Sequence, residues 1–208
     1  MKVKMDKLKN KLKNNNKLII FLVTLIIIGI IAGTIFSLVI NSSDKTLVAD
    51  HLKNFFEAVK NNNLNQLDAF KSAVIDNYIS TIMIWLLGIS IIGLPIILVL
   101  FFSKAFVIGF TIGSILINYK FKGLLISFLY LFPHQIINIL LYLLLIIYSL
   151  AFSIKLLYTL IKRKSIDFKP IITKYLSILL ICLVGFILTS LFEAFVMPNL
   201  INLISPLL

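Results

Sequence analysis

Two ionisable side chains lie inside long apolar stretches of this sequence: His134, beside a proline, and Glu193, near the end of the last stretch. A charge within a membrane span marks function by default, and a His/Glu pair could relay protons or bind a metal. Two ligands do not complete a zinc site, and no H-E-x-x-H or Walker-type motif accompanies them. The structural alternative is that His134 caps backbone groups and Glu193 meets the headgroup region. We therefore expect no catalysis, no cofactor and no metal.

The composition of the chain is typical of a membrane protein. Of its 208 residues, 60% are apolar and 13% are charged, whereas soluble domains average about 45–50% and about 25%. The one cysteine, Cys182, excludes a disulfide within the chain and a cysteine-based metal cluster. Basic residues adjoin the apolar segments, as orienting charges and contacts for anionic lipid headgroups do. No nucleic-acid partner is therefore predicted.

The apolar runs predict an all-α integral membrane fold with five transmembrane helices. The first run, 18–40, is far longer than the apolar part of a secretory signal, so we expect it to stay uncleaved. The predicted segments are a basic head at 1–17, spans at 18–40, 78–102, 105–119, 135–154 and 175–197, a basic loop at 155–174 and a tail at 198–208.

Lysine and arginine are distributed unevenly between the two sides of these spans. One side holds 14 of the 20, in the head, in the loop 155–174 and at Lys104 between the second and third spans. On the other side, basic and acidic residues balance, so the whole formal charge of +12 falls on one side. The positive-inside rule then predicts a cytoplasmic N-terminus and an outer C-terminus.

Glycine and proline predict two irregular places in the spans. Gly88, Gly93 and Pro95 predict a kink or break near the middle of the second span. Pro133 divides a long uncharged stretch, so residues 123–134 are predicted to form a short re-entrant or interfacial helix. Its backbone should be buried in the bundle or lie near the outer surface.

Small residues recur every four positions in two of the spans, which predicts close packing between helices. They are Gly29 and Gly33 in the first span, and Ala105, Gly109 and Gly113 in the third.

Residues 41–77 form the only sizeable polar stretch predicted outside the membrane. Apolar side chains recur there with helical spacing, which predicts two amphipathic helices on the outer surface. Their apolar faces either pack on the bundle or the lipid interface, or dock an extracytoplasmic partner. For docking, the candidate residues are Phe55, Phe56 and Phe70.

Four blocks of the sequence resemble the stage II sporulation protein M family. They are Trp85-Leu-Leu-Gly-Ile-Ser-Ile-Ile-Gly-Leu-Pro-Ile-Ile, Gly109-Phe-Thr-Ile-Gly, Phe132-Pro133, and Ser190-Leu-Phe-Glu193-Ala-Phe before Pro198. The length, the lysine-rich head and the polar loop after the first span match as well. Relatives in the wider family often have Pro-His-Gly followed by Glu at the break, where this chain has Gln135 and Asn138.

The resemblance implies a non-enzymatic scaffold that acts in sporulation engulfment, in the mother-cell membrane at the septum. Family members form a complex with stage II sporulation proteins D and P, which cut peptidoglycan, and anchor and organise them. Two alternatives stay open. One is a small permease subunit with a separate ATPase docked on residues 155–174, in which helices broken at Pro95 and Pro133 line a substrate site. The other is an intramembrane hydrolase, which would require His134 or Glu193.

Overall fold

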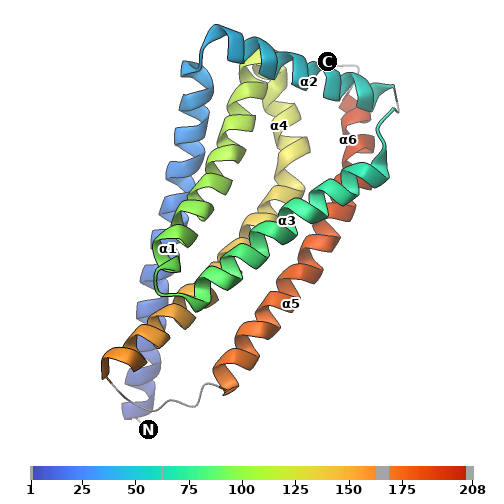
Figure 1. The fold of residues 1–208 in the computed structure, drawn as a ribbon. Coiled ribbons are helices and arrows are strands. Elements are labelled where there is room, and N and C mark those ends of the chain that lie inside the picture. The colour runs from blue at the N-terminus through green and yellow to red at the C-terminus, as the bar shows by residue number, and fades with distance from the viewer. Residues whose placement is uncertain (1, 62, 163–168, 205–208) are drawn as a thin grey trace.

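The protein is a bundle of long helices (Figure 1). The computed structural model describes residues 2–61, 63–162 and 169–204, and these are helical apart from short connections, with no strand among them. This confirms the all-α prediction. The helices are α1 (Lys2–Val39), α2 (Ser42–Lys60), α3 (Gln66–Ile89), α4 (Gly93–Lys162), α5 (Lys169–Leu191) and α6 (Met197–Ile204), with a π-helical turn η1 (Phe192–Val196) between the last two.

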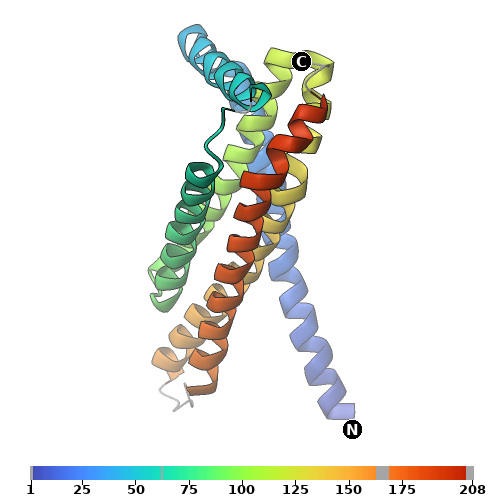
Figure 2. The ribbon, with the colours of Figure 1, turned by 90° about the vertical axis from the view of Figure 1, so that its right-hand side faces the viewer.

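Five helical segments are long and apolar enough to cross a membrane, which confirms the predicted multi-pass architecture. They are Asn16–Val39, Gln66–Ile89, Gly93–Lys120, Pro133–Thr159 and Lys169–Asn202. Helix α2 lies across one end of the bundle, here named the α2 end, and the N-terminus lies at the opposite end (Figures 1 and 2). Residues 163–168 of the predicted basic loop and 205–208 of the predicted tail are outside the described residues.

The predicted second span, 78–102, is not one helix. Helix α3 ends at Ile89, and the chain turns before α4 begins at Gly93. In this turn the Ser90 N–H donates to the Leu87 carbonyl oxygen at 3.0 Å, and the Gly93 N–H donates to the Ser90 carbonyl oxygen at 3.2 Å. Pro95 therefore lies in the first turn of α4, where a missing N–H leaves no hydrogen bond unmade. Of the kink or break that glycine and proline predicted here, the structure has a break, at which the chain reverses its direction.

This turn corrects two further predictions. Helix α3 reaches back to Gln66, so the second predicted amphipathic helix is the first part of a membrane span. The third span starts at Gly93, so Lys104 lies within it and not in a turn between spans.

Helix α4 contains a second reversal, at Lys120, whose φ of 50° and ψ of −130° are not helical. The first arm of α4, Gly93–Lys120, runs toward the α2 end, and the second arm, residues 121–162, runs back (Figure 1). Pro133 lies inside the helix of the second arm, whereas we predicted a helix break there. Helices in membranes tolerate proline where neighbours satisfy the freed backbone groups. A re-entrant or interfacial position of residues 123–134 stays a prediction.

Helix α1 crosses the first arm of α4 at the small residues, as their spacing predicted. A methyl group added at Gly33 would overlap the carbonyl oxygen of Phe106, and one at Gly109 would overlap that of Ile30. The Thr34 hydroxyl donates to the Gly109 carbonyl oxygen at 3.0 Å across the contact. Because glycine has no side chain, the two helix backbones can touch here, as in other close helix pairs in membranes.

The turn between α3 and α4 is fixed to α5 by Tyr175. Its hydroxyl donates to the Trp85 carbonyl oxygen at 2.7 Å and hydrogen-bonds the Ser149 hydroxyl at 2.9 Å. Its ring stacks on those of Trp85 and Phe152, with centroids 5.5 and 4.7 Å away. A side chain at Gly88 would overlap the Tyr175 hydroxyl. These contacts give the Trp85–Gly88 part of the sequence motif a structural role.

Helix α2 is held across its end of the bundle by a small apolar cluster. Its buried members are Phe56 and Val59 of α2, Ile115 of α4 and Ile201 of α6. The Phe56 ring meets that of Tyr119 edge-on, with centroids 5.3 Å apart. The apolar face of α2 therefore packs on the bundle, which was one of the two alternatives for this helix.

Candidate functional site

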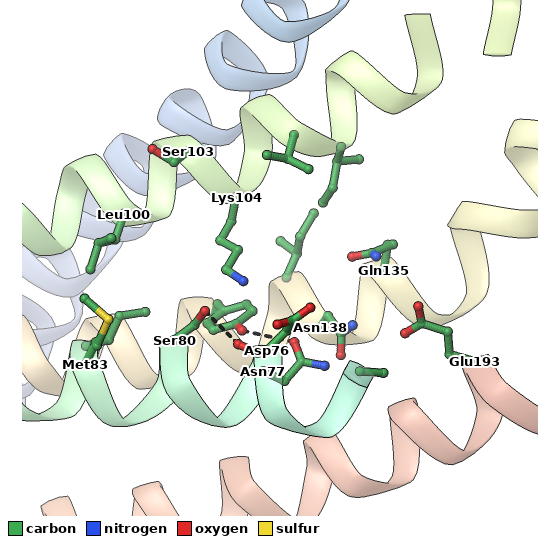
Figure 3. A pocket seen from close by; sticks show the side chains of 16 residues that line it. Asp76, Asn77, Ser80, Met83, Leu100, Ser103, Lys104, Gln135, Asn138 and Glu193 are labelled. Carbon is green, nitrogen blue, oxygen red and sulfur yellow. Dashed lines mark hydrogen bonds between the residues drawn. The ribbon is translucent and has the colours of Figure 1, made fainter. Parts of the chain in front are cut away.

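A polar cavity of about 400 Å³ lies between α3, both arms of α4 and the π-helical turn η1 (Figure 3). Charged side chains from three elements line it: Asp76 from α3, Lys104 from the first arm of α4 and Glu193 from η1. Amide side chains of Asn77, Gln135 and Asn138 also line it. A π-helical turn often occurs at a functional site, and here it supplies one of the carboxylates.

The cavity lies deep within the spans. Asp76 is ten residues after Gln66, where α3 begins, and Lys104 is eleven residues after Gly93, where α4 begins. At 1.5 Å per residue, each lies about 15 Å or more from the nearer end of its span. The hydrocarbon layer of a bilayer is about 30 Å thick, so we expect both charges to lie within it.

The back wall of the cavity is a network of buried polar groups. The Tyr142 hydroxyl donates to Asn77 Oδ1 at 3.1 Å, and Asn77 Nδ2 donates to Ser190 Oγ at 3.5 Å. The Thr189 hydroxyl donates to Asn138 Oδ1 at 2.6 Å. All five side chains are buried. Hydrogen bonds between buried polar groups restrict their orientation, so this wall presents a fixed set of polar atoms.

The Lys104 side chain extends from α4 into the cavity toward the side chains of α3 (Figure 3). Its ammonium nitrogen lies 5.3 Å from the centroid of the Tyr142 ring, within the range of a cation–π contact. Asp76 faces the same cavity from α3. The opposite charges are separated by more than an ion-pair distance, because no Lys104–Asp76 pair within 4.0 Å occurs in the described part of the chain.

The two ionisable residues singled out from the sequence meet beside this cavity. His134 Nε2 lies 3.9 Å from Glu193 Oε2, and the His134 side chain is 1% exposed. Within the described residues, no three His, Cys, Asp or Glu side chains are grouped so that they could hold a metal ion. What the arrangement offers is a polar space with charges of both signs inside an apolar bundle.

A family model described as stage II sporulation protein M matches residues 18–198, from the first span into α6. The chain belongs to the stage II sporulation protein M family. This confirms the resemblance carried by the four sequence blocks. Neither a curated protein nor a solved structure matches the chain. All residues that line the cavity lie within the part that matches the stage II sporulation protein M model.

The other site residues predicted for this stage II sporulation protein M family member pack against neighbouring side chains or lie within helices. Phe56 is buried, Phe55 is half-buried against it, and the Phe70 ring packs 6.3 Å from that of Phe195. The side chains of these three docking candidates therefore pack against other residues of the protein. Pro95 lies in the first turn of α4 and Pro133 lies inside its second arm, so neither breaks a helix at the cavity.

Sequence reasoning missed the charged residues Asp76 and Lys104 of the cavity. We assigned Asp76 to an outer polar stretch and Lys104 to a turn, because the predicted bounds of the second and third spans were wrong. The signal that could have found them is the Ser90-Ile91-Ile92-Gly93 segment. If this segment is taken as a turn, one span ends before it and the next begins after it, and Asp76 and Lys104 then fall inside those spans.

Proposed function

We propose that this protein is a non-enzymatic membrane scaffold of the engulfment machinery. In this role it holds the peptidoglycan hydrolases, stage II sporulation proteins D and P, at the septum and in the engulfing mother-cell membrane. The observation that carries the proposal is the family match over residues 18–198. The five spans supply an anchor, and α2 supplies a surface at one end of it.

The proposed docking surface is the outward face of α2. Leu47, Asp50, His51, Asn54 and Glu57 follow one another at helical spacing and are all exposed. These residues replace Phe55, Phe56 and Phe70 as candidates, since the side chains of that set contact the bundle. An exposed, mixed polar and apolar helix face of this length can bind a protein partner without dismantling the fold beneath it.

Charge supports an outer position for α2. In the part of the chain that the structure describes, eleven lysines lie toward the end opposite α2, in the first part of α1 and where α4 ends and α5 begins. Six lie toward the α2 end, and Lys104 lies between. Without Lys104, basic residues are still much more numerous at the end opposite α2. The positive-inside rule therefore still favours a cytoplasmic N-terminus and an outer α2.

Crosslinking and affinity capture of the tagged protein from sporulating cells tests the scaffold proposal. Mass spectrometry of the captured proteins should identify secreted or membrane-anchored peptidoglycan hydrolases. Capture of a cytoplasmic nucleotide-binding ATPase without any hydrolase would contradict the scaffold.

A permease subunit is the second candidate function, and the polar cavity favours it. Transporters commonly bind substrates near the bilayer midplane, and Asp76 and Lys104 line a cavity between candidate spans. In this case the ATPase would dock on the predicted basic loop, residues 155–174. The same capture experiment separates the two candidates, because they predict different partners on different sides of the membrane.

A further inference from the structure

Two of the charges in the cavity, those of Lys104 and Asp76, have no directly bonded partner among the residues that the structure describes. In the described part of the chain, neither the Lys104 ammonium nor the Asp76 carboxylate makes a hydrogen bond or an ion pair. A charge without a partner in the hydrocarbon layer is costly, and such charges usually serve an ion or substrate. Three charged side chains from three different elements converge on one space, so a bound group could satisfy them together.

The cavity has the size and the fixed walls of a ligand site. Its volume of about 400 Å³ falls in the range of small-molecule pockets, about 300–1,000 Å³. Asn77, Asn138 and Tyr142 are already fixed by hydrogen bonds at the back wall. A ligand would therefore meet oriented polar groups at the back and charged side chains nearer the opening.

The charges indicate which kind of ligand the cavity would take. Two carboxylates, of Asp76 and Glu193, face it together with one ammonium, of Lys104. A ligand that carries a positive and a negative group would complement both signs, whereas a simple anion would meet the two carboxylates. Lysine also serves commonly as a point charge for phosphate.

The opening of the cavity faces sideways, between α3 and the first arm of α4. Asp76, Met83, Ser103 and Val107 line the cavity and are also exposed on the bundle surface. Met83 and Val107 give this rim an apolar part, as a contact with lipid requires. A ligand with acyl chains could therefore place its headgroup in the cavity and keep its chains in lipid.

We propose that this cavity binds a zwitterion of the phosphoethanolamine kind. The primary ammonium of the ligand faces the carboxylates of Asp76 and Glu193, and its phosphate faces Lys104. The ligand is either a phospholipid headgroup or the free zwitterion, which share this chemistry. The site does not depend on the scaffold role, because binding is a property of the chain without its partners.

Binding to the full chain, purified in detergent without phosphate, tests the proposal. The probes are dihexanoyl phosphatidylethanolamine, dihexanoyl phosphatidylglycerol and free phosphoethanolamine, followed by native mass spectrometry and calorimetry. The ethanolamine lipid should bind at least about tenfold more tightly than the glycerol lipid, which has equal chains but no ammonium. Tight binding of free phosphoethanolamine indicates a soluble ligand, and binding of the lipid alone indicates a headgroup. Equal binding of both lipids, or binding of none of the probes, overturns the proposal.

Matched variants assign the binding to the cavity. Asp76→Asn and Lys104→Met should each weaken binding of the tightest probe by about tenfold or more. Asp50→Asn makes the same chemical change on the exposed face of α2 and should leave binding unchanged. Ser103→Phe narrows the opening without removing a charge and should weaken binding while the circular dichroism spectrum stays helical. Unchanged binding in the folded Asp76, Lys104 and Ser103 variants overturns the site.

Discussion

His134 Nε2 lies 3.9 Å from Glu193 Oε2, although the two residues are 59 positions apart in the sequence. The second arm of α4 and the π-helical turn η1 bring the two side chains together at one side of the polar cavity. At this separation the atoms do not form a hydrogen bond, because N–H···O bonds are about 2.7–3.2 Å long. The pair is a close approach of two polar groups whose surroundings differ, His134 being buried and Glu193 partly exposed.

The difference in burial predicts different costs of substitution at the two positions. Glu193→Gln keeps the shape of a partly exposed side chain and should change the free energy of unfolding by less than about 1 kcal/mol. His134→Ala removes a buried ring and should cost about 1–3 kcal/mol through the space that it leaves. Unfolding in mixed detergent, followed by circular dichroism, measures both. Equal and large losses would show instead that the two side chains stabilise the fold as a strongly coupled pair.

The crossing of α1 and α4 should not tolerate a side chain at Gly109. In Gly109→Ala the new methyl group would overlap the backbone of Ile30, so the helices must separate, at a cost of about 1–3 kcal/mol. Gly185→Ala is the matched control, because its methyl group would meet only the side-chain end of Leu141, at 2.8 Å. The same detergent unfolding assay should rank Gly109→Ala well below Gly185→Ala. Equal stability of the two variants would show that α1 adjusts freely.

Tyr175 should stabilise the turn between α3 and α4 through its hydroxyl as well as its ring. Tyr175→Phe keeps both ring stackings and removes the hydrogen bonds to Trp85 and Ser149, so it should cost about 1–2 kcal/mol. Tyr148→Phe is the control, since no hydrogen bond of its hydroxyl is found in the described part of the chain. Unfolding followed by the fluorescence of Trp85, the single tryptophan, reports on this turn directly. A loss of equal size in both variants would contradict the assigned role.

Apolar runs and small-residue spacing predicted the fold class, the number of spans and close helix packing at the small residues, because each depends on local composition. The bounds of α3 and α4 could not be predicted in this way. Ser90 and Gly93 turn the chain inside a continuous apolar run, and an average over such a run does not reveal a turn of three residues. An isolated lysine between apolar stretches commonly marks a membrane boundary. Lys104 is an exception whose position depends on the tertiary structure.

The position of Lys104 predicts that its side-chain charge serves ligand binding and does not stabilise the fold. Lys104→Met removes a charge that has no ion-pair partner, and the methionine side chain can occupy much of the same space. The free energy of unfolding should therefore stay unchanged or rise by up to about 1 kcal/mol. Detergent unfolding of the purified variant provides the measurement. A loss of more than about 1 kcal/mol would indicate that Lys104 mainly ties α4 to its neighbours.

The outward face of α2 should be the surface that captures partners. Asn54→Arg places a long cation at the middle of this face and should lower the recovery of stage II sporulation proteins D and P by about tenfold or more. Asn199→Arg makes the identical change at the same end of the bundle, at an exposed position of α6, and should leave recovery near that of the unchanged protein. Both variants keep the packed side of α2, where Phe56 and Val59 lie, so equal membrane levels are expected and are measured by immunoblot. If both arginines abolish capture, added charge at this end is responsible and not the α2 face. If neither does, the partners are held elsewhere, and the spans become the next surface to test.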